Sequence, residues 1–234
     1  MIEMFQPQVS SFAGEIDSLI LFVTVMVGFW YLLTKGMFFY LIFRFREKPG
    51  VKAEYITGKE KHLKRWVTIP HLVIILCDVF LIFGAVRVWY NVKQFMPEAQ
   101  QTIRVVGQQW AWTFQHPGPD GELDTDDDIS LIDELHIESG VTYHFMLESK
   151  DVLHNFSVPA FRLRQDAVPG RRILGWFKAE VTGEYDIQCA EMCGIGHGIM
   201  GAKLYVESPE QHSSWIRDMS VTEVAAATVR EDLR

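Results

Sequence analysis

The sequence predicts a two-helix transmembrane hairpin followed by an all-β soluble domain. Three observations support this: two long apolar runs near the N-terminus, a change in charge near residue 90, and short β-rich segments beyond it. Residues 1–90 carry ten basic and seven acidic side chains, whereas residues 91–234 carry twelve basic and 23 acidic ones. The net charge of −8 argues against nucleic-acid binding, and three cysteines are too few for a disulfide scaffold.

The two apolar runs cover residues 19–43 and 66–89. Each has about 24 residues and would be roughly 36 Å long as a helix, enough to cross a bilayer with some tilt. The first run is too long for a signal-peptide core, and no basic residue precedes Lys35, so a retained helix is expected. The predicted segments are therefore an N-terminal segment, 1–18, and a membrane hairpin, 19–90.

Charge asymmetry predicts the orientation of the hairpin. Residues 44–65 hold eight basic side chains against Glu47, Glu54 and Glu60, whereas residues 1–18 hold three acidic side chains and no basic one. The positive-inside rule places the loop in the cytoplasm and both ends outside. We expect a multi-pass protein of the inner (plasma) membrane with its soluble domain on the periplasmic side.

Four ionisable residues interrupt the apolar runs, Lys35 in the first and His71, Asp78 and Arg87 in the second. Asp78 lies near the middle of the second run, where a charged carboxylate costs about 2.5–3.5 kcal/mol on insertion scales. Such groups usually face protein or water, so the hairpin is expected to pack against a larger membrane partner. Lys35 and Arg87 are expected to reach a polar contact or the membrane surface.

Beyond residue 90 the chain alternates β-rich stretches with turn residues, which favours a sandwich or barrel over residues 91–207. The predicted strands are 102–106, 136–137, 141–147, 156–158, 173–178, 185–188 and 203–206. Ser208 and Pro209 then predict the cap and first residue of a helix that runs through Met219. We expect residues 208–234 to form this helix and a tail.

One segment, residues 189–200, carries the candidate metal chemistry. Cys189, Cys193, His197 and Met200 lie within twelve residues, and His154 precedes them by 35. Thiolate, imidazole and thioether ligands suit copper better than calcium or magnesium, and a second cysteine suggests two bridged copper ions. A zinc site with both cysteines and both histidines, or a Cys189–Cys193 disulfide, are the alternatives.

This pattern, an upstream His154 and then C-x-E-x-C-x-x-x-H-x-x-M, resembles subunit II of the haem-copper oxidases, the cytochrome c oxidase family. The resemblance runs from about residue 19 to 206 and includes residues 151–154 and 165–171. It implies a cupredoxin-like Greek-key barrel that carries a dinuclear CuA centre. The implied copper ligands are the bridging Cys189 and Cys193, one imidazole per ion from His154 and His197, and weak contacts from Met200 and the Glu191 carbonyl.

The resemblance also implies the function. The chain would accept electrons from cytochrome c, or a similar one-electron donor, and pass them to haem in subunit I, where O₂ is reduced. Trp110, within residues 107–114, matches the position where electrons enter, whereas Trp112 is expected in the strand core. The Glu191 side chain would bind Mg²⁺ or Mn²⁺ at the subunit I interface. Without a C-x-x-C-H motif, no haem is expected in this chain.

Several further expectations and alternatives follow. The acidic stretch 120–134 is expected to be solvated and to steer a basic donor. Leu63 stands where proton-conducting relatives commonly carry a glutamate, which puts proton uptake by that route in doubt.

A CuA subunit of a nitric oxide reductase is the alternative function. A quinol oxidase subunit is disfavoured because those subunits lack the copper ligands, and a free-standing carrier because of the hairpin.

Overall fold

The computed structural model describes residues 6–52 and 55–232, of which residues 221–232 are described by their backbone alone. The chain divides into two compact units. One contains Glu15–Asn91, and the other joins the chain up to Gly14 with the chain from Val92 onward. Residues 1–5 of the predicted N-terminal segment, and Glu54 of the predicted cytoplasmic loop, lie outside the described residues.

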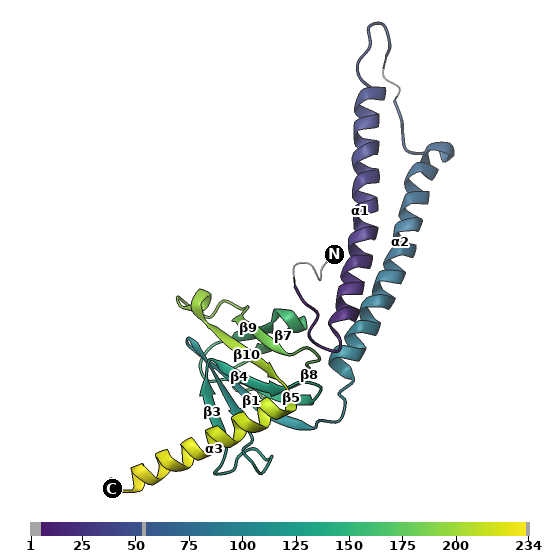
Figure 1. The fold of residues 1–234 in the computed structure, drawn as a ribbon. Coiled ribbons are helices and arrows are strands. Elements are labelled where there is room, and N and C mark those ends of the chain that lie inside the picture. Colours follow the sequence, from purple (N-terminus) through teal and green to yellow (C-terminus); the bar gives the residue numbers. More distant parts are fainter. Residues whose placement is uncertain (1–5, 53–54, 233–234) are drawn as a thin grey trace. The chain divides into compact units, whose positions relative to one another are not determined.

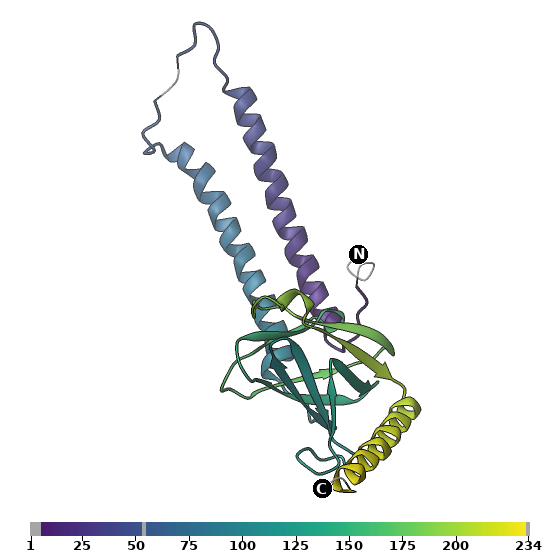
Figure 2. The same ribbon diagram turned by 90° about the vertical axis from the view of Figure 1, so that its left-hand side faces the viewer.

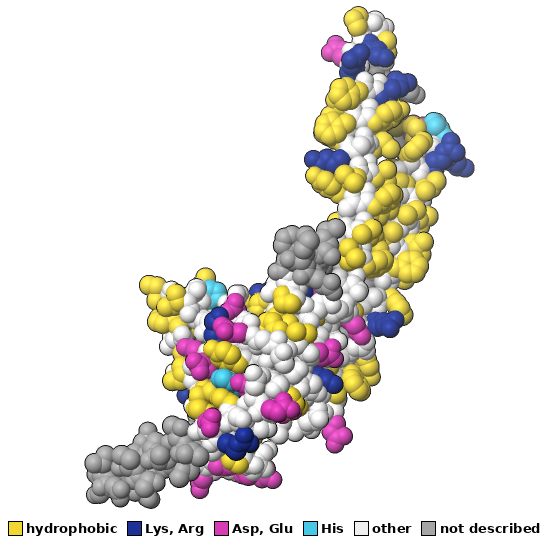
Figure 3. Space-filling view, in the orientation of Figure 1, with side chains coloured by type: hydrophobic (Ala, Val, Ile, Leu, Met, Phe, Trp, Pro, Cys, Tyr) yellow, Lys and Arg dark blue, Asp and Glu magenta, His cyan; other side chains and the backbone are white. Residues whose placement is uncertain are grey.

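The first unit is a pair of long helices, α1 (Ala13–Arg44) and α2 (Lys61–Trp89), which lie side by side in Figures 1 and 2. A short π-helix, Tyr90–Gln94, continues α2. Within the described residues, two helical spans are long and apolar enough to cross a membrane, Ala13–Arg44 and Lys61–Gln94. Hydrophobic side chains cover their surface, as Figure 3 shows, which fits a lipid environment.

The second unit is built from ten strands in two sheets. In the first sheet the spatial order is β3 (Ile129–Ile132), β2 (Ala111–His116), β1 (Gln101–Gln108), β5 (Thr142–Ser149) and β8 (Ile173–Lys178). In the second it is β4 (Glu134–Glu138), β10 (Gly201–Glu207), β9 (Gly183–Cys189), β6 (His154–Val158) and β7 (Leu163–Ala167). The β1–β5 and β4–β10 pairs are parallel, and the other pairs are antiparallel.

The two sheets pack through a core of aromatic and branched side chains. Phe145 of β5 stacks on Phe177 of β8 with ring centroids 5.8 Å apart, and meets Phe156 of β6 in the opposite sheet at 5.7 Å. All three rings are fully buried. The predicted fold class is thus confirmed: two apolar helices precede a cupredoxin-like all-β domain, whose two sheets form a sandwich.

Two strands, β3 and β7, have no counterpart in the sequence prediction, and β2 was anticipated only through Trp112, which was expected in the core of a strand. β7 lies at the edge of its sheet and has the sequence LRQDA, in which Arg164 and Asp166 are exposed, so it lacks the β-branched and aromatic residues by which strands are recognised. Strand β3 has only four residues, ISLI, and follows the acidic loop.

Residues 6–14 of the N-terminal segment belong to the same compact unit as the β-domain. The Val9 amide donates to the Ala160 carbonyl at 3.1 Å, and the Glu180 amide donates to the Val9 carbonyl at 2.7 Å. Val9 is fully buried, and Phe12 packs edge-on against Trp176 at 5.2 Å. These residues therefore extend the sheet edge beside β8, which the prediction of residues 1–18 as an extracytoplasmic N-terminal segment did not anticipate.

Helix α3 (Pro209–Asp232) begins as predicted but runs past Met219. The Gln211 amide donates to the Ser208 hydroxyl at 3.3 Å, which confirms Ser208 as the N-cap. Three consecutive alanines at 225–227 favour helix beyond the predicted end. A histidine cluster lies where this helix meets the sandwich, around Trp215.

In this cluster the Glu207 carboxylate accepts hydrogen bonds from the Nδ1 atoms of His136 and His212, at 2.8 and 2.9 Å. The His116 ring meets the Trp215 ring edge-on at 5.1 Å. His116 is 3% exposed, and its Nε2 has no hydrogen-bond partner among the described residues. Burial, and then the charges of His136 and His212, lower the pKa of His116 to about 3.

This burial predicts an acid-sensitive domain. His116 stays neutral in the folded chain while the unfolded chain binds a proton near pH 6.5, so its contribution to stability is present above pH 6.5 and is lost as the pH falls towards about 3. The His116→Phe variant should lose stability less steeply across that window, by up to about 1.4 kcal/mol per pH unit. Urea unfolding of the metal-free chain in detergent between pH 7 and 4 measures both slopes; equal slopes would contradict the assignment.

Candidate metal centre

The candidate ligands gather where β9 and β10 are joined. β9 ends at Cys189 and β10 begins at Gly201, so residues 190–200 form a loop between two hydrogen-bonded strands. The ladder continues to the base of the loop, since Gly201 pairs with Gln188 and the Cys189 amide donates to the Met200 carbonyl at 3.0 Å. Both ends of the ligand loop are therefore fixed by backbone hydrogen bonds.

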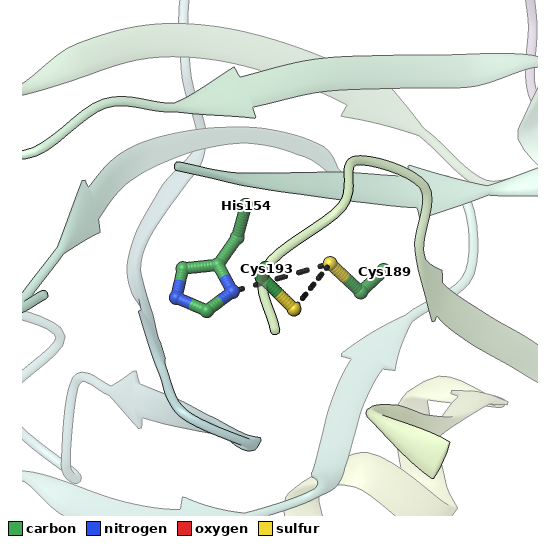
Figure 4. A group of neighbouring side chains, drawn as sticks. All are labelled: His154, Cys189 and Cys193. Carbon is green, nitrogen blue, oxygen red and sulfur yellow. Dashed lines mark hydrogen bonds between the residues drawn. The ribbon is translucent and has the colours of Figure 1, made fainter. Parts of the chain in front are cut away.

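The two cysteines are at the centre of the group. Their Sγ atoms lie 3.7 Å apart, and both thiols are free. The S–S bond of a disulfide is about 2.05 Å long, so this structure does not contain the disulfide alternative. Figure 4 shows the two sulfurs converging beside the His154 ring, and the ligand atoms of these three residues all lie within 4.8 Å of one another.

The remaining donors flank the two sulfurs. The Nδ1 atom of His154, at the start of β6, lies 4.0 Å from the Cys189 Sγ. The Nδ1 atom of His197 lies 3.6 Å from the Cys193 Sγ, and the Met200 Sδ lies 3.8 Å from the same sulfur. Each thiol thus has one imidazole beside it, and the Cys193 thiol also has the Met200 thioether beside it.

The site is closed to solvent on its inner side. His154 is fully buried, and Met200, Cys193 and Cys189 are only 2, 3 and 8% exposed. Burial, and then the Cys189 thiol, raise the pKa of Cys193 to about 11. A bound cation would reverse this preference, because metal binding releases the thiol proton.

Asp151 orients the His154 ligand. Its Oδ1 atom accepts a hydrogen bond from His154 Nε2 at 2.8 Å, which leaves Nδ1 to face the sulfurs. Its Oδ2 atom accepts from the Gln109 amide at 2.6 Å. Burial raises the pKa of Asp151, but hydrogen bonds from Gln109, His154 and Val152 outweigh it and hold that pKa below its ordinary value. The sequence marked Asp151 only as part of a matching stretch and gave it no role.

The β1–β2 turn contacts the loop from outside. The Nε1 of Trp110 donates to the Cys193 carbonyl at 3.2 Å, and Gln109 Nε2 donates to the same oxygen at 2.8 Å. Trp110 is 37% exposed, whereas Trp112 is fully buried and meets the His154 ring edge-on at 6.0 Å. Trp112 is therefore the core residue that was predicted. The sequence marked Gln109 only as part of the matching stretch 107–114 and gave it no role.

Glu191 contributes two separate groups. Its backbone carbonyl accepts a hydrogen bond from the Cys189 thiol at 3.3 Å, so this oxygen faces the sulfurs. Its side chain is exposed. The sequence prediction gave these two groups different metals, and in the structure the carbonyl contacts the Cys189 thiol whereas the side chain is exposed to solvent.

The acidic stretch is partly structural. Arg104 forms two 2.9 Å hydrogen bonds with the Asp124 carboxylate, and the Trp112 amide donates to Asp133 Oδ1 at 2.8 Å. Arg104 lowers the pKa of Asp124. Asp126 is exposed. Among the described residues, no group of acidic side chains here meets the spacing of a metal site.

The donor set fits copper. Two thiols, two imidazoles and a thioether are joined by successive contacts of 3.6 to 4.0 Å, and all of them except the half-buried His197 are buried. Soft sulfur ligands with imidazole select copper or zinc, and the thioether aimed at Cys193 favours copper. The described residues form a copper-type site of histidine, two cysteines and methionine.

The sequence is similar to those of known cytochrome c oxidase subunits. Residues 123–207 match the family described as "Cytochrome C oxidase subunit II, periplasmic domain". The chain is 31% identical to the alternative cytochrome c oxidase subunit 2 of Bradyrhizobium diazoefficiens over 220 residues, which cover 82% of this chain and 78% of that protein. It is 29% identical to cytochrome c oxidase subunit 2 of Cereibacter sphaeroides, over 91% of this chain and 78% of that one.

A solved structure is also similar. The periplasmic domain of cytochrome oxidase subunit II from Bradyrhizobium japonicum aligns with a TM-score of 0.49 and 26% identity. The alignment covers 55% of this chain and 99% of that domain.

Asp151 yields a test of the site that leaves every ligand in place. We expect Asp151→Ala to weaken copper binding by about 10–100-fold, the usual cost of losing the partner of a metal-bound histidine. Competition with a copper chelator measures the affinity. Asp126→Ala, which removes an exposed carboxylate from the same domain, should bind copper as the wild type does. Equal affinities of the Asp151→Ala and wild-type proteins would contradict the orienting role.

Proposed function

This chain belongs to the cytochrome c oxidase subunit II family, and from that premise we propose that it receives electrons for a haem-copper oxidase through a dinuclear CuA centre. The observation that carries the proposal is the pair of thiols 3.7 Å apart with an imidazole beside each one. Two thiolates and two imidazoles alone would also suit one zinc ion. The Glu191 carbonyl, 3.3 Å from the Cys189 Sγ, and the Met200 thioether, 3.8 Å from the Cys193 Sγ, add one further donor on each side, which supports two ions.

In this proposal each ligand has a distinct task. Cys189 and Cys193 would hold both ions, His154 and His197 would hold one each, and the Met200 thioether and the Glu191 carbonyl would be weak further ligands. When bound, the two coppers share one electron and so accept and release it with little change in geometry. The protein has two further tasks: it must fix the positions of the ligand side chains, and it must exclude water from the site.

The fold supplies both conditions. The β9–β10 ladder fixes the ends of the loop, and the Asp151 hydrogen bond fixes the His154 ring. Burial of the two thiols, His154 and Met200 excludes water from the inner side. A site that needs no rearrangement suits electron relay rather than substrate turnover, so O₂ reduction is assigned to haem in subunit I.

The partners and location follow from the two units. We assign the hairpin to the inner (plasma) membrane, where it would contact subunit I and other oxidase subunits, and the β-domain to the periplasmic side. The exposed Asp78 on α2 supports a protein neighbour within the membrane. Cytochrome c, or a similar one-electron donor, would approach the side of the site where Trp110 is exposed, with the acidic stretch adding a steering field.

A second cation is part of the proposal. The Glu191 side chain is exposed immediately beside the copper ligands, and a carboxylate oxygen suits Mg²⁺ or Mn²⁺. Such an ion would lie where the ligand loop meets subunit I. Because its other ligands would come from that partner, we expect the isolated chain to bind it weakly.

The bridging role of Cys193 is open to a direct test. The Cys193→Ser variant should bind at most one copper per chain, because a hydroxyl oxygen is a poor bridge between two soft ions. Copper quantitation with electron paramagnetic resonance (EPR) of the purified chain measures the change. Cys77→Ser, in α2, is the matched control and should retain the wild-type stoichiometry. Two coppers with a mixed-valence signal in Cys193→Ser would overturn the bridge.

A further inference from the structure

The indole ring of Trp110 lies directly on the backbone of the ligand loop. A Cβ atom built on Gly196 would lie 2.4 Å from Cδ2 of this ring, 2.6 Å from Cγ and 2.8 Å from Cε3. A Cβ built on Gly194 would lie 3.2 Å from Cζ2 and 3.3 Å from Nε1 of the same ring. The two glycines therefore support opposite parts of one indole, and any side chain at position 196 would occupy the space of the ring.

This close approach also sets a hydrogen bond. With the ring flat on the loop, Trp110 Nε1 donates to the Cys193 carbonyl at 3.2 Å. That carbonyl belongs to a proposed copper ligand, so the indole is linked to the Cys193 Sγ by one hydrogen bond and the residue's own covalent bonds. Gly196 itself is buried, although Ile195 beside it is 96% exposed, which shows how fully the ring covers this point of the loop.

The backbone at position 196 does not itself require glycine. Gly196 has φ −89° and ψ 8°, a conformation that other residues adopt in turns. Gly194, by contrast, has φ +119°, where any other residue would be strained. At position 196 glycine is therefore needed for space alone, and the space is that of the Trp110 ring.

We propose that Gly196 is a positioning residue for electron uptake: the missing side chain seats the Trp110 indole on the ligand loop and holds its hydrogen bond to Cys193. The proposal rests on the proposed function of Trp110 as the point where electrons enter. One electron leaves the reduced donor and one arrives at the copper site through Trp110 and Cys193. No bond forms or breaks, and no proton moves.

The loop offers a matched pair of variants. Gly196→Ala adds one methyl group under the indole, whereas Gly198→Ala adds the same group two residues away, where no atom lies within 4 Å. Neither residue is a metal ligand in the proposal. Both variants should bind the wild-type amount of copper with an unchanged EPR spectrum, and they should differ in the placement of Trp110.

The first readout needs neither copper nor turnover. In metal-free full-length chain labelled with ¹⁵N-tryptophan, the indole N–H signal of Trp110 is identified by its loss in Trp110→Phe. Gly196→Ala should shift that signal and speed its hydrogen exchange, because the ring is displaced from the Cys193 carbonyl. Gly198→Ala should leave it in place. An unchanged Trp110 signal in Gly196→Ala would overturn the proposed packing.

The second readout is the rate of copper reduction in the assembled oxidase, with a reduced c-type cytochrome as donor in stopped flow. We expect Gly196→Ala to be about tenfold slower than Gly198→Ala, within the loss that a misplacement of about 1 Å causes in enzymes. Trp110→Ala separates the two claims. If it leaves the rate unchanged, electron uptake at Trp110 is wrong; if it slows the rate and Gly196→Ala does not, the positioning role alone is wrong.

Discussion

The short ladder between β9 and β10 is the constraint on which the site depends. Cys189 ends β9, and Cys193, His197 and Met200 belong to the loop that follows it; the ladder pairs Gln188 with Gly201, and the Cys189 amide donates to the Met200 carbonyl. Four soft donors are thereby brought together by local chain geometry, and only His154 must come from elsewhere. It does so from the first residue of β6, which pairs with β9 in the same sheet.

A second layer of contacts comes from the opposite sheet. The β1–β2 turn reaches the site through Gln109 and Trp110, which both donate to the Cys193 carbonyl, while Asp151 joins the Gln109 amide to the His154 ring. The segment that is proposed to receive electrons is therefore connected by hydrogen bonds to Cys193 and, through Asp151, to His154. The same contacts that orient the ligands also connect the site to the surface.

Sequence reasoning succeeded where one local pattern decides the outcome. Hydropathy is enough to find the two helices, because a bilayer span must be apolar along its whole length. The ligand loop is also local, so the spacing of Cys189, Cys193, His197 and Met200 indicates a metal site without knowledge of the fold. The cap at Ser208 is another local signal, which depends on one hydroxyl and the amides that follow it.

What the sequence could not provide depends on contacts between distant residues. The N-terminal segment joins the sheet edge through backbone atoms of Val9, which carry no residue-specific signal. Edge strand β7 buries only Leu163 and Ala167 of its five residues, which is too few apolar residues for hydrophobic periodicity to indicate a strand. Trp110 packs on Gly196, 86 positions away in the chain. Glycine is common in loops, so the sequence alone does not indicate that position 196 must be free of a side chain.

The most direct measurement of the central claim is copper quantitation combined with EPR on the wild-type, full-length chain in detergent after loading with copper. Two coppers per chain and a mixed-valence signal, with one unpaired electron shared by both ions, is the predicted result. A signal from a single isolated copper would contradict the dinuclear centre. Zinc bound in preference to copper would contradict the electron-relay function itself.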